Sequence, residues 1–320
     1  MVNSVVSPPF ADLVGQTQAI ELLTRAVVQN RLAPAYLFAG PEGVGRSLAA
    51  YGLIELLFDN PASTPLKGLQ QRIRQHNHPD LFWVEPTYLH QGKRLTAAEA
   101  AEAGLKRKGS PIIRLDQIRE ITRFLGRPPL EAARSVVVIE QAETMPDAAA
   151  NALLKTLEEP GQATLILIAP GVESLLPTLV SRCQRIPFYR LSAEAIAQVL
   201  AQTEYAEILQ HPEVLALAQG SPGEAIAHWQ QLQAISQDLL NLVRQLPTSL
   251  RGALDLARTI AKELDTEAQL WLIDYLQQHY WQEQGQPAHL NSLEQARRYL
   301  LQYVQPRLVW EVTLMQLGNV

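Results

Sequence analysis

Two hydrophobic patterns divide the chain near Leu191. Before this residue, short apolar runs alternate with longer segments whose apolar residues recur at helical spacing. Such runs are typical of buried parallel strands, and they are Ala35–Gly40 (AYLFAG), Ser135–Glu143 (SVVVIEQAE) and 163–170 (ATLILIAP). After Leu191 only helical spacing remains. The pattern predicts an α/β region with a parallel sheet covered on both faces, followed by an all-helical region.

Four helices are predicted in this region, over residues 17–31, 46–58, 114–126 and 147–160, and a short helix followed by a strand is predicted within 173–188. In the third, Ile118 and Ile121 share one apolar face, and Asp116 stands where an acidic residue favours the start of a helix. A further strand is expected within 78–86 (HPDLFWVEP). Gly92–Pro111, with its small and charged residues, is expected to form an exposed and partly mobile excursion.

Composition narrows the class of protein. The 320 residues are 47% hydrophobic and carry a net charge of −5, so binding of nucleic acid by bulk electrostatics is not expected. The single cysteine, Cys183, rules out an internal disulfide framework and a multi-cysteine zinc site. The first residues do not have the pattern of a secretory signal, and no apolar run reaches the ~18 residues of a membrane span. A cytoplasmic location without membrane contact is expected.

The segment Ala39–Ala50 (AGPEGVGRSLAA) is close to a phosphate-binding loop. Gly40 and Gly45 keep the spacing of that motif, Gly43 adds backbone freedom, and Ser47 keeps the hydroxyl that binds Mg²⁺. Arg46 stands where the motif has lysine, and a planar guanidinium does not replace a compact ammonium at a crowded phosphate site. The predicted strand before the loop and the helix after it are the context that the motif requires.

The acidic half of such a site is also altered. A working site has a metal-binding aspartate and a glutamate that polarises water at the end of a neighbouring strand. Here Glu140 and Gln141 follow the strand VVVI, and Gln141 cannot accept a proton as a general base must. Two changed catalytic positions favour a degenerate site that does not hydrolyse ATP. The alternative, that the glycines serve only a tight turn, stays open.

Several segments together resemble the AAA+ subunits of bacterial clamp loaders. The resemblance rests on residues 10–47, on HPDL at 78–81, on DAAANALLKTLEEP at 147–160 and on LLPTLVSRCQRIPF at 175–188. The last segment contains Ser181-Arg182-Cys183, which matches the SRC motif of that family. The resemblance covers about residues 10 to 188, and AQGSPGEAI at 218–226 extends it to the family's lid.

This resemblance implies a division of labour between subunits. Arg182 would act in trans, as an arginine finger in the ATP site of a neighbouring subunit, instead of lying as an ordinary ion-paired surface arginine. The implied role is that of a non-hydrolysing stator in a hetero-pentameric ring with the motor ATPase subunit and a delta-type subunit. The ring would load a sliding clamp on primer–template DNA. Cys183 is interpreted as a packing residue, because no paired base is evident.

The resemblance also implies a domain plan and a cofactor requirement. Residues 1–188 would form a P-loop AAA+ domain with a degenerate nucleotide site, 189–234 a helical lid and 235–320 a helical collar. No cofactor is expected to be required, and weak binding of ATP or ADP stays open.

The chain departs from the family pattern in three places. Residues 59–77 lack the four cysteines of the family's zinc module, so no zinc is predicted, and the nearby histidines are interpreted as solvent-exposed: His76, His78 and His90. In the lid, Gly223 and Glu224 stand where an active subunit has an arginine that senses nucleotide. Lys106–Lys108 could contact DNA, although a solvated charged loop is the simpler interpretation.

Two other functions are weighed against the stator. The first is an ATP-binding or active clamp-loader ATPase in which Arg46 replaces the lysine and Glu140 the metal-binding acid. The second is a stand-alone AAA+ remodelling enzyme, which the altered acidic pair disfavours.

Overall fold

The computed structural model describes residues 9–59, 66–104, 109–159, 161–284 and 287–319. The chain forms two compact units, Met1–Ala195 and Ile196–Val320. The predicted division of the second part into a lid and a collar, with boundaries at 188 and 234, stays a prediction.

The first unit is built on a five-stranded parallel sheet with the strand order β2-β5-β6-β1-β7. The strands are β1 (Ala35–Ala39), β2 (Leu81–Val84), β5 (Ser135–Ile139), β6 (Ala163–Ala169) and β7 (Gln184–Pro187). Every residue of β5 and β6 is buried. A strand that is covered on both faces needs apolar side chains at successive positions, which is why these two read as continuous hydrophobic runs. The predicted parallel sheet is confirmed.

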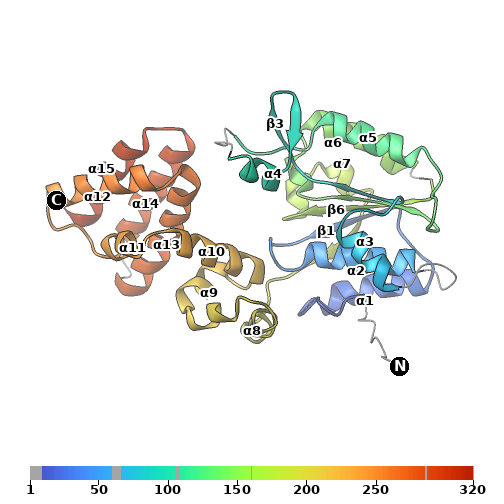
Figure 1. Ribbon diagram of the computed structural model, residues 1–320, viewed down its shortest axis with the longest axis horizontal. Coiled ribbons are helices and arrows are strands. Elements are labelled where there is room, and N and C mark those ends of the chain that lie inside the picture. Colours follow the sequence, from blue (N-terminus) through green and yellow to red (C-terminus); the bar gives the residue numbers. More distant parts are fainter. Residues whose placement is uncertain (1–8, 60–65, 105–108, 160, 285–286, 320) are drawn as a thin grey trace. The chain divides into compact units, whose positions relative to one another are not determined.

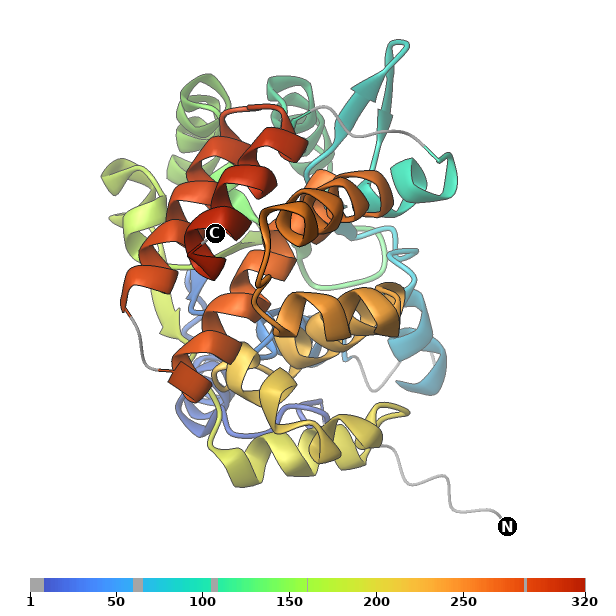
Figure 2. The same ribbon diagram turned by 90° about the vertical axis from the view of Figure 1, so that its left-hand side faces the viewer.

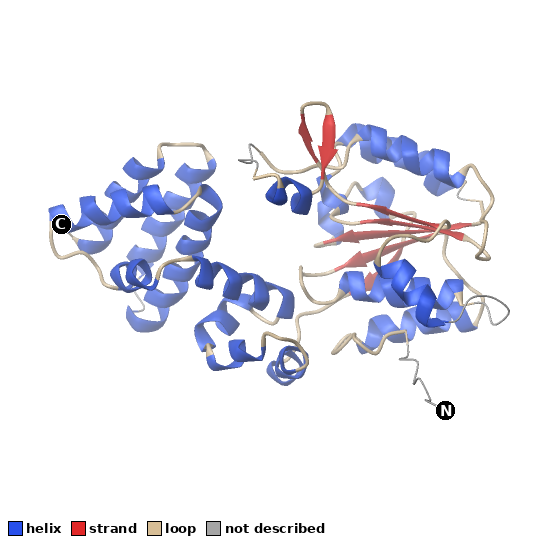
Figure 3. Ribbon diagram, in the orientation of Figure 1, coloured by secondary structure: helices blue, strands red, loops and turns tan. Residues whose placement is uncertain are grey.

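Helices cover both faces of the sheet (Figures 1 and 3). On one face lie α1 (Thr17–Val28), α2 (Arg46–Phe58) and α3 (Leu66–Arg74); on the other lie α5 (Leu115–Leu125), α6 (Asp147–Glu158) and α7 (Pro177–Val180). Ile118 and Ile121 of α5 are buried against the sheet together with Leu153 of α6. Short 3-10 turns follow β5 and β6, at Ala142–Thr144 and Val172–Ser174.

The described part of Gly92–Pro111 is more regular than predicted. Strands β3 (Tyr88–His90) and β4 (Lys93–Leu95) form an antiparallel hairpin, and α4 (Ala97–Glu102) follows with a capping box at its start. The two-residue turn has positive φ at Gln91 and Gly92, which suits the twist of a hairpin. Arg94 donates to Glu120 of α5 and so ties the hairpin to the unit. Lys106–Lys108 lie outside the described residues.

The only regular elements in the described residues of the second unit are helices, as predicted. Its helices are α8 (Ala193–Ala201, which begins in the first unit), α9 (Pro212–Ala218), α10 (Pro222–Ala234), α11 (Gln237–Arg244), α12 (Leu250–Glu263), α13 (Thr266–Gln284), α14 (Pro287–Leu301) and α15 (Pro306–Gly318). A 3-10 segment, Ala206–Gln210, precedes α9. Helix α15 lies beside α12 and α14 (Figure 2).

The core of the second unit is held by aromatic residues whose polar atoms are paired. Trp310 is fully buried, and its indole N–H donates to Gln269 Oε1 at 2.9 Å. The Tyr280 hydroxyl donates to the Val243 carbonyl oxygen at 2.7 Å. Buried tryptophan and tyrosine need such partners, because an unpaired N–H or O–H in an apolar interior is costly.

Candidate functional site

The phosphate-type loop joins β1 to α2 at the carboxyl end of the sheet. The Gly40 N–H donates to the Ala169 carbonyl of β6 at 3.2 Å, which fixes the start of the loop. Gly43 and Gly45 have φ of 69° and 101°, in the region that favours glycine, and α2 begins directly after Gly45. The local geometry is therefore that of a loop whose backbone turns into the N-terminus of a helix, where anions bind readily.

Two of the loop glycines are also required by the protein's own packing. A Cβ atom at Gly40 would lie 2.3 Å from the Phe188 carbonyl oxygen, and one at Gly45 would lie 2.5 Å from Leu13 Cδ1. Leu13 is itself buried. These contacts account for glycine at both positions without any bound phosphate.

Gln16 holds the loop from the N-terminal side. Its side chain is buried, and Nε2 donates to the Val44 carbonyl in the loop at 3.2 Å and to the Tyr189 carbonyl at 2.7 Å. The Tyr189 N–H donates back to Gln16 Oε1 at 3.2 Å. One amide thus connects the loop to the segment after β7. Sequence reasoning missed this residue, because its three hydrogen bonds go to two residues that lie 28 and 173 positions away.

Arg46, at the lysine position, is buried. It is only 9% exposed, and its Nη1 has no hydrogen-bond partner among the described residues. Burial lowers the pKa of the guanidinium, and the nearby carboxylates of Glu42, Glu143 and Glu140 oppose that shift. The positive charge at the loop is therefore set among three acidic side chains of the same chain.

Ser47 and Glu140, which stand at the metal-binding positions of the degenerate motif, lie side by side. The Ser47 hydroxyl donates to Glu140 Oε1 at 2.6 Å. The structure thus brings together the loop and the strand end, as the sequence predicts, but the hydroxyl already bonds the carboxylate. Within the described residues no cluster of three or more acidic, histidine or cysteine side chains could hold a metal ion.

The position of the general base has no carboxylate. Gln141 is exposed and directly precedes the 3-10 turn that follows β5, with φ of 47°. Two residues on, Glu143 has a buried and unpartnered Oε2, and burial raises its pKa while Arg46 lowers it. Sequence analysis did not single out Glu143, because its position two residues after Gln141 does not match the spacing of the motif.

Arg182 follows α7 on the surface, where its guanidinium makes two contacts. Nη2 donates to Glu158 Oε1 at 2.7 Å and Nη1 to the Thr178 carbonyl at 3.0 Å. The Arg182 side chain is 37% exposed and that of Glu158 is 54% exposed. Burial raises the pKa of the neighbouring Cys183 thiol to about 11, and this thiol packs against the core. A neutral packed thiol suits the predicted packing role.

The HPDL segment has a structural role, and one prediction about it is wrong. His78 is buried, stacks on Phe58 and accepts a hydrogen bond from the Asp80 N–H, although it was expected to be exposed. The His78 ring is buried because it packs on the buried Phe58 of α2, with ring centroids 4.4 Å apart. His76 and His90 are exposed, and the His76 ring stacks on Trp83 with centroids 4.3 Å apart.

In the second unit, Gly223 and Glu224 lie in the first turn of α10. The Glu224 N–H donates to the hydroxyl of Ser221, which caps the helix, at 3.1 Å. The first turn of α10, where an active subunit of the resembled family has a nucleotide-sensing arginine, thus carries an acidic side chain in this chain.

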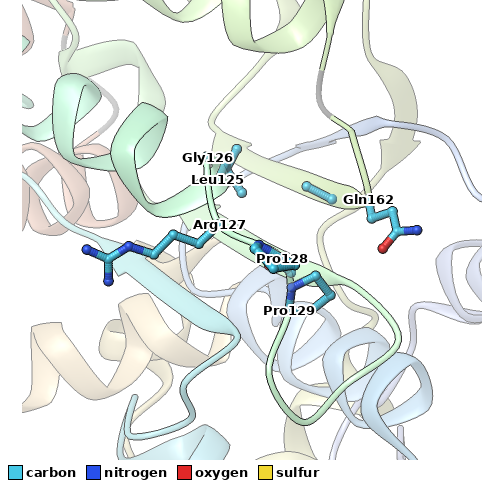
Figure 4. A pocket seen from close by; sticks show the side chains of 8 residues that line it. Leu125, Gly126, Arg127, Pro128, Pro129 and Gln162 are labelled. Atoms are coloured by element: carbon cyan, nitrogen blue, oxygen red, sulfur yellow. The ribbon is translucent and has the colours of Figure 1, made fainter.

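A shallow pocket of about 190 Å³ lies at the opposite end of the sheet (Figure 4). It is lined by Leu125, Gly126, Arg127, Pro128, Pro129, Ser135, Gln162 and Ala163. Ser135 and Ala163 are the first residues of β5 and β6. Ligands of parallel α/β sheets bind at the carboxyl ends of the strands, so this pocket is separate from the candidate site.

Comparison with known families matches nearly the whole chain. The model described as "DNA polymerase III, delta subunit" matches residues 15–192. The model described as "Cyanobacterial DNA polymerase III delta prime, C-terminal domain" matches residues 194–317. None of the helices in the described part of the chain combines the length and hydropathy that a bilayer span requires.

Individual relatives agree with the family models. The chain is 39% identical over 199 residues to DNA polymerase III subunit delta' of Pseudomonas aeruginosa. This match covers 59% of this chain and 54% of that protein. It is 32% identical over 193 residues to the subunit delta' of Bacillus subtilis, covering 59% and 52%. The matched segment spans about half the length of these relatives.

Among solved structures, the chain resembles a DNA polymerase III gamma subunit-related protein of Thermotoga maritima. The TM-score is 0.50 and the identity 17%, with 94% of this chain and 99% of that chain covered. This likeness concerns the fold alone.

Proposed function

The chain belongs to the family of DNA polymerase III delta and delta-prime subunits, and we propose that it is a non-hydrolysing clamp-loader stator that supplies Arg182 to a neighbour's ATP site. The observation that carries this proposal is the contrast between two arginines. Arg46 is buried in the chain's own loop among carboxylates, whereas Arg182 is presented at the surface.

The chain's own loop is poorly suited to hydrolysis. Glu42, Glu140 and Glu143 offset the charge of Arg46 that would otherwise meet a triphosphate. The Ser47 hydroxyl is bonded to Glu140, and the exposed Gln141 offers no base. Because phosphoryl transfer depends on positive charge and a positioned nucleophile, these features support a loop that is retained for the fold.

Arg182 has the properties that an arginine acting on another subunit needs. Its backbone is fixed by the turn after α7, because its N–H donates to the Leu179 carbonyl at 3.1 Å. A guanidinium has five N–H donors, and the two contacts to Glu158 and Thr178 leave three for another acceptor. A guanidinium at this position could stabilise the charge that spreads over a transferring phosphoryl group.

The proposed partners follow from the family. The relatives bear the names of subunits, so we place this chain in an assembly with other clamp-loader subunits, a motor ATPase and a delta-type subunit. We propose a hetero-pentameric ring that loads the sliding clamp on primed DNA, in the cytoplasm and without a required cofactor of this chain. Head-to-tail contacts in such a ring would place Arg182 at a subunit boundary.

Substitution of Arg182 tests the proposal. In a complex reconstituted with its motor subunit, Arg182→Ala is expected to abolish the DNA-stimulated ATP turnover of the adjoining site while the complex still assembles, since an arginine finger contributes roughly 10³-fold or more to turnover. Arg185→Ala, an exposed arginine of β7, is the matched control. Unchanged turnover in Arg182→Ala would contradict the finger role.

An ATP-binding subunit is the second candidate, and one observation favours it. Arg46 Nη1 is buried at the loop without a hydrogen-bond partner among the described residues, which an anion could satisfy. Equilibrium binding of ATP and ADP to the isolated chain separates the two functions. If the isolated chain binds ATP with micromolar affinity and hydrolyses it in a way that Ser47→Ala abolishes, the chain is an active ATPase and the stator proposal is wrong.

A further inference from the structure

The ion pair between Glu158 and Arg182 joins the end of α6 to the surface arginine. Nη2 of Arg182 lies 2.7 Å from Glu158 Oε1, and the Thr178 carbonyl takes Nη1 at 3.0 Å. We propose that Glu158 is a positioning residue for Arg182, which holds the guanidinium in the orientation used in trans. This inference rests on the proposed function of Arg182.

The two contacts restrain a side chain that is otherwise free to rotate. Arginine has many rotamers, and ordering them at the moment of reaction opposes catalysis. The carboxylate and the carbonyl each accept from a different Nη atom, so together they fix the plane of the guanidinium. Three N–H groups stay available for a phosphate oxygen. An arginine ordered before the neighbour's nucleotide arrives stabilises transition-state charge without reorganisation.

Glu158 is placed against the electrostatic preference of its own helix. It is the last residue of α6, where the partial negative charge of the helix terminus disfavours a carboxylate. The guanidinium of Arg182 compensates this unfavourable charge. The next residue, Glu159, is also exposed, but it makes no ion pair with any described residue. The pair at Glu158 is therefore specific to one of two adjacent carboxylates.

The alternative role for Glu158 is that of a competitor, whose carboxylate takes the place on Arg182 that a phosphate oxygen would occupy. Both side chains are well exposed, so solvent screens their attraction and the carboxylate does not cancel the positive charge. A competitor would have to leave before Arg182 could act, whereas the three free donors allow Glu158 to stay in place. The two roles differ in what removal of the negative charge does to turnover.

The test uses ATP hydrolysis by the complex reconstituted with its motor subunit, with kcat and KM for ATP measured separately. Glu158→Ala is expected to lower kcat of the adjoining site roughly two- to five-fold, the range expected for an exposed ion pair, with KM unchanged. Glu158→Gln keeps an oxygen that accepts from Nη2, so it is expected to restore most of this loss. Glu159→Ala is the matched control and is expected to match the wild type.

Combination with Arg182→Ala separates the possible failures. If Glu158 acts through Arg182, then Glu158→Ala has no further effect in the Arg182→Ala background. A wild-type rate in Glu158→Ala, while Arg182→Ala is defective, overturns the positioning role alone. Faster turnover in Glu158→Ala or Glu158→Gln overturns it in favour of a competitor. An unchanged rate in Arg182→Ala contradicts the finger itself, and with it any role of Glu158 in turnover.

Discussion

Removal of the Asp80 carboxylate is expected to destabilise the first unit strongly. Asp80 is buried, and its two oxygens accept three backbone N–H bonds from the segment before β5: Leu130 at 2.6 Å on Oδ1, and Glu131 at 2.8 Å and Ala132 at 2.7 Å on Oδ2. Burial alone would raise the pKa of Asp80, but these bonds outweigh it and hold the pKa below its ordinary value.

The size of the effect follows from the bonds that each variant keeps. Hydrogen bonds to a charged group contribute about 1.5–3 kcal/mol each, and the low end applies because Leu130 and Glu131 are exposed to water. Asp80→Ala removes all three, so the free energy of unfolding should fall by about 4–5 kcal/mol. Asp80→Asn can place its one oxygen where Oδ2 lies and keep two neutral bonds, so the loss should be about 2–3 kcal/mol.

Amide hydrogen exchange measures this loss in the right unit. Four of the five tryptophans, all except Trp83, lie in the second unit, so total fluorescence would report mainly on that unit. The Val136 N–H of β5, which donates to the Asp80 carbonyl at 2.8 Å, is a core amide that reports on opening of the first. Asp147→Asn, an exposed acid at the start of α6, is the control and should change stability by less than about 1 kcal/mol.

The pH dependence gives a second check with a definite sign. Because the pKa of Asp80 is lowered in the folded state, its contribution is present above the unfolded pKa of about 4 and is lost as the pH falls through the folded value. The difference between wild type and Asp80→Asn should therefore stay constant near neutral pH and shrink below about pH 4. An Asp80→Asn protein within 0.5 kcal/mol of wild type at pH 7, on the order of the error of such measurements, would refute this account.

Two further substitutions test the loop and the helical core. Gly45→Ala should lower the free energy of unfolding by about 2–4 kcal/mol, since φ is 101° and the new Cβ would lie 2.5 Å from Leu13 Cδ1. Gly92→Ala is the control and should lower it by only about 1 kcal/mol, because φ is positive but no atom lies within 4 Å of the new Cβ. Trp310→Phe should lower the free energy of unfolding, measured by thermal unfolding, by about 2–4 kcal/mol, because it leaves a small cavity and removes the indole hydrogen bond. Trp281→Phe, on the surface, should have little effect.

The sequence could predict the parts of the candidate site whose residues lie close together in the chain. Gly40, Gly45 and Ser47 lie within eight residues, and a strand before them and a helix after them fix their geometry through backbone preferences alone. The carboxyl-end rule for parallel strands places Glu140, after β5, at the same sheet edge as the loop after β1. The hydrogen bond between Ser47 and Glu140 itself was not predicted. The exposed position of Arg182 after a short helix also follows from the chain around it.

By itself, the sequence determined the strands of the parallel sheet, the change to an all-helical second part and the loop before α2, because each depends on hydrophobic period and on residues close in the chain. It did not predict the hairpin of β3 and β4 or the helices α3 and α4. Only the tertiary structure decided that His78 is buried, that Gln16 bonds the loop and that Glu158 pairs with Arg182. The same holds for the carboxylates around Arg46, which come from segments about a hundred residues apart. Burial and charge depend on such distant neighbours, and local periodicity does not encode which segments become neighbours.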